Sequence, residues 1–227
     1  MQAIIFDFDG TILETELPDF ISWQECYADH NCDLPHDLWL SAVGGSAAEF
    51  DPYAYLEQQV GRRLDRAILR ERRRTRMNTL IAEQSVRPGV LEVIADAQRL
   101  GLQLGVASSS GRDWVEGHLN RLGLRHHFAA LFTRDDVVRV KPDPMLYTLA
   151  VNALDVQPAH AVAIEDSRNG MLAAKGAGLK CVVVPNAVTQ QLHFPEADLQ
   201  MQSLADRPLE AWLQALPQSK LELSELD

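Results

Sequence analysis

The sequence has little cysteine, fewer positive than negative charges, and no long apolar run. Its three cysteines, Cys26, Cys32 and Cys181, show neither metal-ligand spacing nor an even disulfide framework, which is typical of reduced thiols in a cytoplasmic protein. No stretch approaches the roughly 20 apolar residues of a membrane span, and no signal-like segment follows Met1. These absences predict a cytoplasmic localisation and no membrane partner.

The charge balance also argues against one class of partner. The formal net charge is −11, and a chain of this sign binds nucleic acid poorly, so we expect no nucleic-acid partner. A phosphate-bearing ligand would have to be met by local cations. One cluster exists, because residues 62–76 contain eight arginines against two acids, a local charge of +6. We interpret it as a solvated helix face paired with acids elsewhere; the alternatives are an anion-attracting patch beside the site or a nucleic-acid contact.

The first predicted strand ends in two carboxylates. Residues 3–6 are apolar strand formers, and Asp7, Asp9 and the turn residue Gly10 follow them. Side chains alternate along a strand, so two acids at this spacing can point the same way near its end. Their repulsion is costly unless a cation or phosphate chemistry uses them. A simple Asp-Gly turn is the alternative interpretation.

The remainder of the 227 residues, of which 46% are hydrophobic overall, follows two patterns. Helical periodicity from about residue 14 to residue 85 predicts an all-helical insert, whereas short strands alternate with helices from residue 87 onward. This alternation implies a parallel sheet with right-handed crossovers, hence an α/β, doubly wound fold. The expected strands after the first are 102–107, 130–133, 161–164 and 180–184, and the expected helices are 90–100, 114–122, 144–154, 169–177 and 206–216. We expect the acidic tail 217–227 to be mobile.

Polar residues useful to phosphate chemistry follow the predicted strands. Ser108, Ser109 and Ser110 follow the second strand, and Glu165 and Asp166 end a late one. Lys141 precedes a helix start marked by a proline. In an open parallel sheet the carboxyl ends of the strands share one edge, where ligands bind. Each of these groups alone would more often be a helix cap or a solvated charge, but their joint placement predicts a site.

The motifs that carry these residues resemble those of the haloacid dehalogenase superfamily. They are DFDGT at residues 7–11, VASSS ending in Ser108 to Ser110, VKPDP with Lys141, and AIEDS with Glu165 and Asp166. The helical insert after the first motif resembles the cap of the phosphatase and β-phosphoglucomutase-like branch. The resemblance implies a Rossmann-like catalytic core of residues 1–13 and 85–227, with a helical cap domain of residues 14–84.

The resemblance also implies roles. Asp7 would be the nucleophile that forms an aspartyl-phosphate, and Asp9 the general acid and base. Mg2+ would be held by Asp7, the backbone carbonyl of Asp9 and Asp166, with Glu165 supporting this metal site. Ser108 and Lys141 would complete the catalytic set. The residues implied or suggested to bind the phosphate or a distal anion are Gly10, Ser109, Ser110 and Arg112.

Absent residues narrow the choice within the superfamily. Dehalogenation needs neither a second aspartate nor magnesium, so Asp9 and Asp166 argue against it. Phosphonate cleavage uses a cap lysine, whereas the first lysine of this chain is Lys141. The mutases place an arginine on a cap loop, and the corresponding residues 43–49 contain none. Hydrolysis is therefore favoured over mutase chemistry.

We thus predict a magnesium-dependent phosphatase of a small phosphorylated metabolite, such as a sugar phosphate. The alternatives are a β-phosphoglucomutase-like phosphohexomutase and, from a different class, a non-catalytic phospho-acceptor domain. The latter combines an Asp, a Ser or Thr and a Lys on a parallel sheet, but it carries no large cap. The expected partner is the phosphorylated small molecule; oligomeric state is left open, with a monomer favoured.

Overall fold

A computed structural model of the protein describes residues 1–42 and 50–217. Within these ranges one sheet of six strands has the order β3-β2-β1-β4-β5-β6, and every neighbouring pair is parallel. The strands are β1 (Ala3–Phe6), β2 (Gln103–Ala107), β3 (Ala130–Phe132), β4 (Ala161–Glu165), β5 (Lys180–Val183) and β6 (Leu199–Gln200). Successive strands are added to one side of β1 and then to the other, as in doubly wound α/β proteins.

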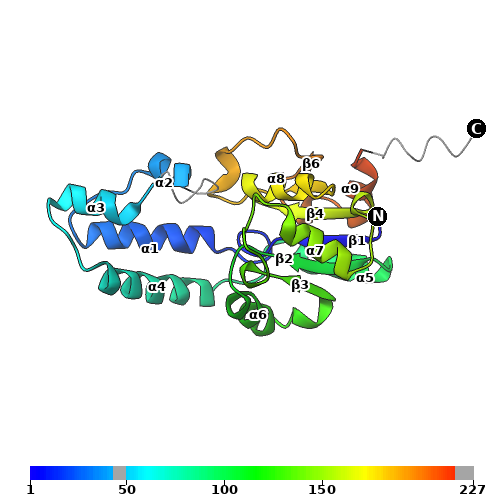
Figure 1. Cartoon of the computed structure of the whole chain (residues 1–227), viewed down its shortest axis with the longest axis horizontal. Coiled ribbons are helices and arrows are strands. Elements are labelled where there is room, and N and C mark those ends of the chain that lie inside the picture. Colours follow the sequence, from blue (N-terminus) through cyan, green and yellow to red (C-terminus); the bar gives the residue numbers. More distant parts are fainter. Residues whose placement is uncertain (43–49, 218–227) are drawn as a thin grey trace, which may run out of the picture.

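Helices cover both faces of this sheet, which confirms the predicted fold class (Figure 1). Ile4 and Phe6 of β1 pack with helices α5, α6 and α9 on one face, and Ala3 and Ile5 pack with α7 and α8 on the other. This alternation follows from the two-residue period of a strand. The core helices are α5 (Val90–Arg99), α6 (Arg112–Arg121), α7 (Met145–Ala153), α8 (Arg168–Gly176) and α9 (Leu209–Ala215), with short 3-10 helices η1 (Arg125–His127), η2 (Arg134–Asp136), η3 (Pro158–His160), η4 (Thr189–Gln191) and η5 (Leu204–Asp206).

The predicted strands and helices of the core are confirmed within a few residues at each end. The edge strand β6 was not predicted, because a two-residue strand leaves too short a pattern to recognise. The tail 218–227, expected to be mobile, lies outside the described residues.

The insert is helical, as predicted, and it has a hydrophobic core of its own. Its helices are α1 (Glu16–Ala28), α2 (His36–Ala42), α3 (Pro52–Val60) and α4 (Arg66–Ala82). Trp23, Tyr27 and Leu56 are buried in this second core. Asp51 and Asp65 cap α3 and α4 by accepting bonds from backbone N–H groups of the first helical turn. Figure 1 shows α1 and α4 side by side, extending away from the sheet.

The insert leaves and re-enters the core at neighbouring points. Leu13 on the outgoing segment and Val86 on the returning one form an antiparallel bridge. Next to it, the Arg87 guanidinium donates hydrogen bonds to the carbonyls of Gly10, Val184 (3.2 Å) and Pro185 (2.9 Å). The junction between the insert and the core is thereby bonded to the loops that follow β1 and β5. None of the described helices has the length and apolar character needed to cross a membrane.

Candidate active site

The site is built around the end of β1. Phe6 pairs with Val106 of β2 and Ile164 of β4, so the residues that follow these three strands meet at one edge. The chain turns sharply at Gly10, whose φ is +74°. A Cβ atom at that position would lie 2.2 Å from the Asp166 Oδ2 atom. Glycine is therefore required there both for its backbone conformation and for the close approach of Asp166.

A buried lysine links two of the acids. The Lys141 Nζ atom donates to Asp7 Oδ1 at 2.5 Å and to Glu165 Oε1 at 2.6 Å. Glu165 is fully buried and also accepts hydrogen bonds from the hydroxyls of Tyr147 (2.5 Å) and Ser167 (3.1 Å). Both of its carboxylate oxygens are thus occupied by protein donors. The arrangement fixes Lys141 against Asp7 rather than leaving it free in solvent.

Crowding of the acids shifts their protonation. Burial raises the pKa of Asp7 to about 7; the Lys141 ammonium opposes this rise, and Glu165 and Asp9 add to it. Burial also raises the pKa of Asp166 well above its ordinary value, and the neighbouring Asp7 and Glu165 carboxylates reinforce the shift. For Lys141, burial favours the neutral form, but Asp7 and Glu165 outweigh it and raise the pKa. Without a further cation, burial and the neighbouring carboxylates therefore favour the protonated forms of Asp7 and Asp166.

Asp7, Glu165 and Asp166 form a buried acidic cluster, because one carboxylate oxygen of each lies within 4.8 Å of the others. With Lys141 charged and all three acids ionised, the cluster carries an excess of two negative charges. Hard oxygen donors with this charge suit a divalent cation such as magnesium, calcium or manganese. Asp166 is oriented by Asn186, whose side-chain amide donates to Asp166 Oδ2 at 2.6 Å. The residues present therefore fit a divalent metal.

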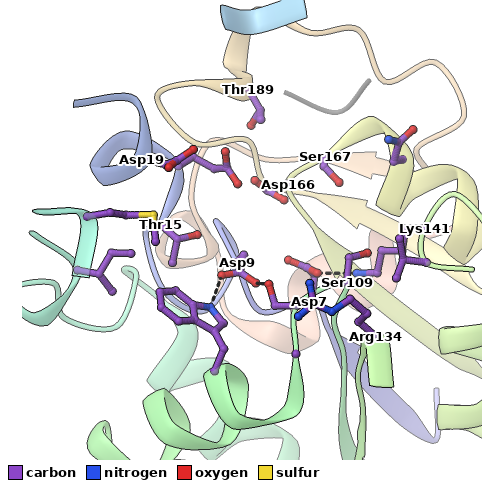
Figure 2. Close-up of a pocket in the computed structure, with 18 of the residues that line it drawn as sticks. Asp7, Asp9, Thr15, Asp19, Ser109, Arg134, Lys141, Asp166, Ser167 and Thr189 are labelled. Atoms are coloured by element: carbon purple, nitrogen blue, oxygen red, sulfur yellow. Dashed lines mark hydrogen bonds and ion pairs between the residues drawn. The ribbon is translucent and has the colours of Figure 1, made fainter. Parts of the chain in front are cut away.

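The second acid of the first motif is held separately. The Asp9 carboxylate accepts bonds from Ser110 Oγ at 2.6 Å, from Ser108 Oγ at 3.4 Å, and from the indole N–H of Trp114 at 2.9 Å. Figure 2 shows Asp9 beside Asp7, on the side toward the cap residues Thr15 and Asp19. Asp7 and Asp9 thus have different partners, one buried among charges and the other held by neutral donors.

These residues lie at the floor of a cleft of about 670 Å³ between the core and the helical insert. The core lines it with Asp7, Asp9, Ser109, Ser110, Lys141 and Asp166, among others. The insert contributes Thr15, Glu16 and Asp19 from the start of α1 and one face of α4. Burial and neighbouring acids, Asp19 and Asp9 foremost, raise the pKa of Glu16 to about 8. The α4 face consists of Arg70, Arg73, Arg74, Met77 and Ile81.

The predicted phosphate-binding residues occupy different places. Ser109 and Ser110 line the cleft, whereas Ser108 is fully buried behind them and accepts a bond from the Ser110 N–H at 3.0 Å. Arg112 is not among the lining residues. Its guanidinium forms two bonds with Asp136, at 2.8 and 2.9 Å, and contacts Glu116. Arg134 lines the cleft instead.

Different arginines of the arginine-rich segment fit two of the interpretations considered for it. Arg66, Arg72, Arg73 and Arg76 form ion pairs with acids of the insert, as the solvated-face interpretation predicts. Arg70 and Arg74, by contrast, line the cleft. The cap loop 43–49, in which the absence of arginine argued against mutase chemistry, lies outside the described residues. The cap nevertheless presents cations to the cleft from α4, so the lack of an arginine in residues 43–49 does not by itself exclude mutase chemistry.

Sequence reasoning missed the residues that orient the acids. Tyr147 lies in α7 and Trp114 in α6, while Asn186 lies in the loop after β5. A tyrosine or tryptophan in an amphipathic helix is usually interpreted as a core residue, and an asparagine in a loop is usually interpreted as a turn residue. The one available signal was position, since Asn186 also follows the carboxyl end of a strand and lies at the same edge.

Comparisons with known proteins identify a matching family and several relatives. The family model of haloacid dehalogenase-like hydrolases matches residues 4–184. YhcW of Bacillus subtilis (strain 168) is 45% identical over 92% of this chain and 94% of its own length. Hexitol phosphatase B of Escherichia coli (strain K12) is 31% identical over 90% and 93%. A crystal structure of CbbY from Rhodobacter sphaeroides in complex with xylulose-(1,5)-bisphosphate has a TM-score of 0.72 at 33% identity and covers 91% of this chain and 96% of that one.

The fold and the site define a phosphoryl-transfer hydrolase with an α/β core and a helical insert. The chain belongs to the haloacid dehalogenase-like hydrolase family.

Proposed function

We propose that this protein is a magnesium-dependent phosphatase that hydrolyses a small phosphorylated metabolite through an aspartyl-phosphate. The observation that carries the proposal is the different environment of two acids two residues apart. Asp7 is paired with a buried lysine and faces the cleft, whereas Asp9 is held by a tryptophan and two serines beside it. Phosphoryl transfer through an enzyme carboxylate needs these two functions, a nucleophile and a proton donor.

In the first half of the reaction, an oxygen of Asp7 attacks phosphorus in line with the leaving oxygen. The Asp–phosphorus bond forms as the bond to the substrate oxygen breaks, and Asp9 gives its proton to that oxygen. In the second half, Asp9 takes a proton from water, and the resulting hydroxide attacks the aspartyl-phosphate. Inorganic phosphate leaves, Asp7 is regenerated, and Asp9 is protonated again.

Mg2+ would be held by the carboxylates of Asp7 and Asp166 and by the backbone carbonyl of Asp9, and when bound it would offset the charge of the transferring phosphoryl group. We propose that Glu165 supports the metal site indirectly. Both of its oxygens are occupied by Lys141, Tyr147 and Ser167, so it fixes the lysine that holds Asp7.

We propose that Ser109 and the loop backbone donate to the phosphoryl oxygens, with Gly10 permitting the close approach of Asp166. Ser108 would act from behind, since its hydroxyl is buried and positions Asp9 and the Ser110 N–H. Ser110 would share its hydroxyl between Asp9 and the substrate. Because Arg112 is engaged by Asp136, we assign it to fixing the start of α6 and give the contact with the substrate to Arg134.

We take residues 14–84 as the cap domain and residues 1–13 and 85–227 as the catalytic core. The cap would close over the substrate and exclude bulk water during transfer. Named relatives include a hexitol phosphatase and a protein crystallised with a ketopentose bisphosphate, which supports a phosphorylated sugar or sugar alcohol as the substrate.

The test is phosphate release from p-nitrophenyl phosphate and from a panel of sugar and polyol phosphates, with and without magnesium. Turnover that requires the metal and disappears in Asp7→Asn is the expected result. Asp96→Asn, an exchange on α5 where the carboxylate pairs with Arg99, serves as the control and should retain activity. Mass spectrometry of acid-quenched enzyme should show a phosphorylated peptide that contains Asp7. Turnover by Asp7→Asn at the wild-type rate would refute the proposal.

A phosphohexomutase is the second candidate, and Arg70 and Arg74 are the observation that favours it. Cations on the cap side of the cleft are what a mutase needs to hold the phosphate that is not being transferred. Incubation with a β-hexose 1-phosphate and a trace of hexose bisphosphate separates the two activities. Free phosphate indicates the phosphatase, and accumulation of the 6-phosphate isomer indicates the mutase.

A further inference from the structure

Arg87 is a half-buried cation that takes no part in the proposed chemistry. It follows Val86 on the segment that returns from the insert to the core, and it is absent from the lining of the active-site cleft. It lines a second cavity instead, together with Glu14 and Asn186 among others. Within the described part of the chain, the hydrogen bonds of its guanidinium all end on backbone carbonyls. Arg87 can therefore act on the site only through other residues.

The first of these carbonyls is that of Gly10, the residue after the proposed metal ligand Asp9. The N–H of Gly10 donates to the Leu13 carbonyl at 2.7 Å, which holds the peptide that contains the Asp9 carbonyl. Glycine has more backbone freedom than any other residue, so this one bond does not fix the turn. The bond from Arg87 to the Gly10 carbonyl restricts the turn from its other side. Arg87 thereby helps to set the direction of the Asp9 carbonyl.

The other two carbonyls belong to the loop after β5. Arg87 donates to the carbonyls of Val184 at 3.2 Å and Pro185 at 2.9 Å. The next residue is the buried Asn186, whose side-chain amide donates to Asp166 Oδ2 at 2.6 Å. The guanidinium thus holds the backbone that places the partner of Asp166. One side chain outside the cleft is bonded to the supports of two proposed metal ligands.

The shape of the guanidinium suits this task. Its Nη1 atom donates to Gly10 and Val184, and its Nη2 atom donates to Pro185, so the planar fork joins the two loops. Its charge also reaches the site: burial and neighbouring carboxylates raise the pKa of Asp166, and the positive charge of Arg87 opposes that rise. A test of the fork therefore has to keep the charge constant.

We infer that Arg87 is a positioning residue of the metal site, which it serves by bonding the turn after Asp9 to the loop before Asn186. The inference rests on the metal ligands of the proposed function and adds a residue that touches neither metal nor substrate. Because Arg87 lies on the returning segment of the insert, the junction of the insert and the geometry of the metal site depend on the same side chain. Loss of a residue that orients metal ligands weakens metal binding about 10- to 100-fold.

Mn2+ binding to the substrate-free protein tests this role, with the free ion measured by electron paramagnetic resonance. Arg87→Met, which keeps an unbranched side chain, should weaken Mn2+ binding about 10- to 100-fold. Arg87→Lys keeps the charge but offers one nitrogen in place of the fork, so it should lose about tenfold or more. The magnesium concentration that gives half-maximal hydrolysis of p-nitrophenyl phosphate should rise by the same factor. The KM for this ester at saturating magnesium should change little.

Arg121 on α6 provides the matched control. It also joins the insert to the core through three backbone carbonyls, those of Ile81, Ala82 and Gln84, at 3.2 to 3.4 Å. These carbonyls lie at the end of α4 and just beyond it, not in the loops of the metal site. Arg121→Met should therefore keep the wild-type affinity for Mn2+. Urea denaturation with a chelator measures the stability of each metal-free variant, which separates a general loss of stability from a loss of metal affinity.

Wild-type Mn2+ affinity in both Arg87 variants would overturn the inference, as would an equal loss of affinity in Arg121→Met. Wild-type affinity in Arg87→Lys would show that the charge is sufficient and would overturn positioning by the fork. If circular dichroism shows that Arg87→Met does not fold, Arg87→Lys decides. A wild-type protein that binds no Mn2+ would reject the inference and the proposed metal site together. A wild-type protein that binds Mn2+ but hydrolyses no phosphate ester would reject the proposed function alone, and the comparison of affinities would still decide the inference.

Discussion

The buried acidic cluster predicts that a divalent metal stabilises the fold and that Asp166→Asn reverses the usual effect of a core substitution. In the metal-free protein three carboxylates face one lysine, and burial together with the like charges raises the pKa of Asp166. Replacing Asp166 by asparagine removes one of the competing charges and preserves the size of the side chain. The metal-free variant should therefore be at least as stable as the metal-free wild type.

The wild type should gain stability when a divalent metal binds, because the metal offsets the repulsion among the three carboxylates. A ligand that binds only the folded state adds about 2.7 kcal/mol at a concentration 100 times its Kd. For a urea m value of about 3 kcal/mol/M, this is a rise of about 1 M in the unfolding midpoint. Asp166→Asn should show little of this gain. Asp9→Asn should keep most of it, because the Asp9 side chain is held by Ser110 and Trp114 outside the cluster.

The gain should also depend on pH. Because burial raises the pKa of Asp7 from 3.8 to about 7, the folded metal-free protein keeps a proton that the unfolded chain has lost between these values. Its free energy of unfolding consequently falls as pH rises through this window, and metal must displace the proton below pH 7. Metal-dependent stabilisation should be larger at about pH 8 than at about pH 5. Urea denaturation with magnesium or with a chelator measures both effects. A wild-type midpoint unaffected by metal at the higher pH, or full metal stabilisation in Asp166→Asn, would refute the reasoning.

Three further predictions follow from single contacts. Trp114→Phe removes the N–H donor to Asp9 and should lower kcat about tenfold with a smaller change in KM, as steady-state kinetics will show; an unchanged kcat would mean that this bond does not position the acid. Tyr147→Phe removes a hydroxyl that donates to the buried Glu165 and should cost about 1.5–3 kcal/mol in urea denaturation, whereas a cost below about 0.5 kcal/mol would contradict the pairing. Gly10→Ala places a methyl group 2.2 Å from Asp166 Oδ2 at a positive φ and should abolish metal-dependent stabilisation. If calorimetric titration showed that the variant binds metal with the affinity of the wild type, the prediction would be contradicted.

The sequence was sufficient to predict that the candidate site residues meet at one sheet edge, because the position of strand ends is set by the topology. Once β1, β2 and β4 are parallel and adjacent, Asp7, Ser108 and Asp166 must meet at one edge, whatever the details of the loops. The strand periodicity and the glycine after the first motif carry this information locally.

The orientation of individual side chains could not be predicted in the same way. Arg112 and Arg134 are both loop-proximal arginines at the same sheet edge, and only the folded η2 segment brings Asp136 to the first and leaves the second facing the cleft. Similarly, the sequence of residues 62–76 does not show which of its eight arginines form ion pairs with acids and which do not. That distinction depends on which face of α4 packs against α1, a contact between residues about 50 positions apart.

The bridge between Leu13 and Val86 has a consequence for how such a protein diversifies. The helical insert is joined to the core through two adjacent segments, so lengthening, shortening or exchanging it leaves the ends of the core in place. The ends of β1 and β4, which carry the acids, and the segment before α7, which carries Lys141, belong to the core and do not depend on what lies beyond the bridge. Substrate preference can therefore change by insertion and recombination within one segment of the gene, while the chemistry encoded on either side of it stays the same.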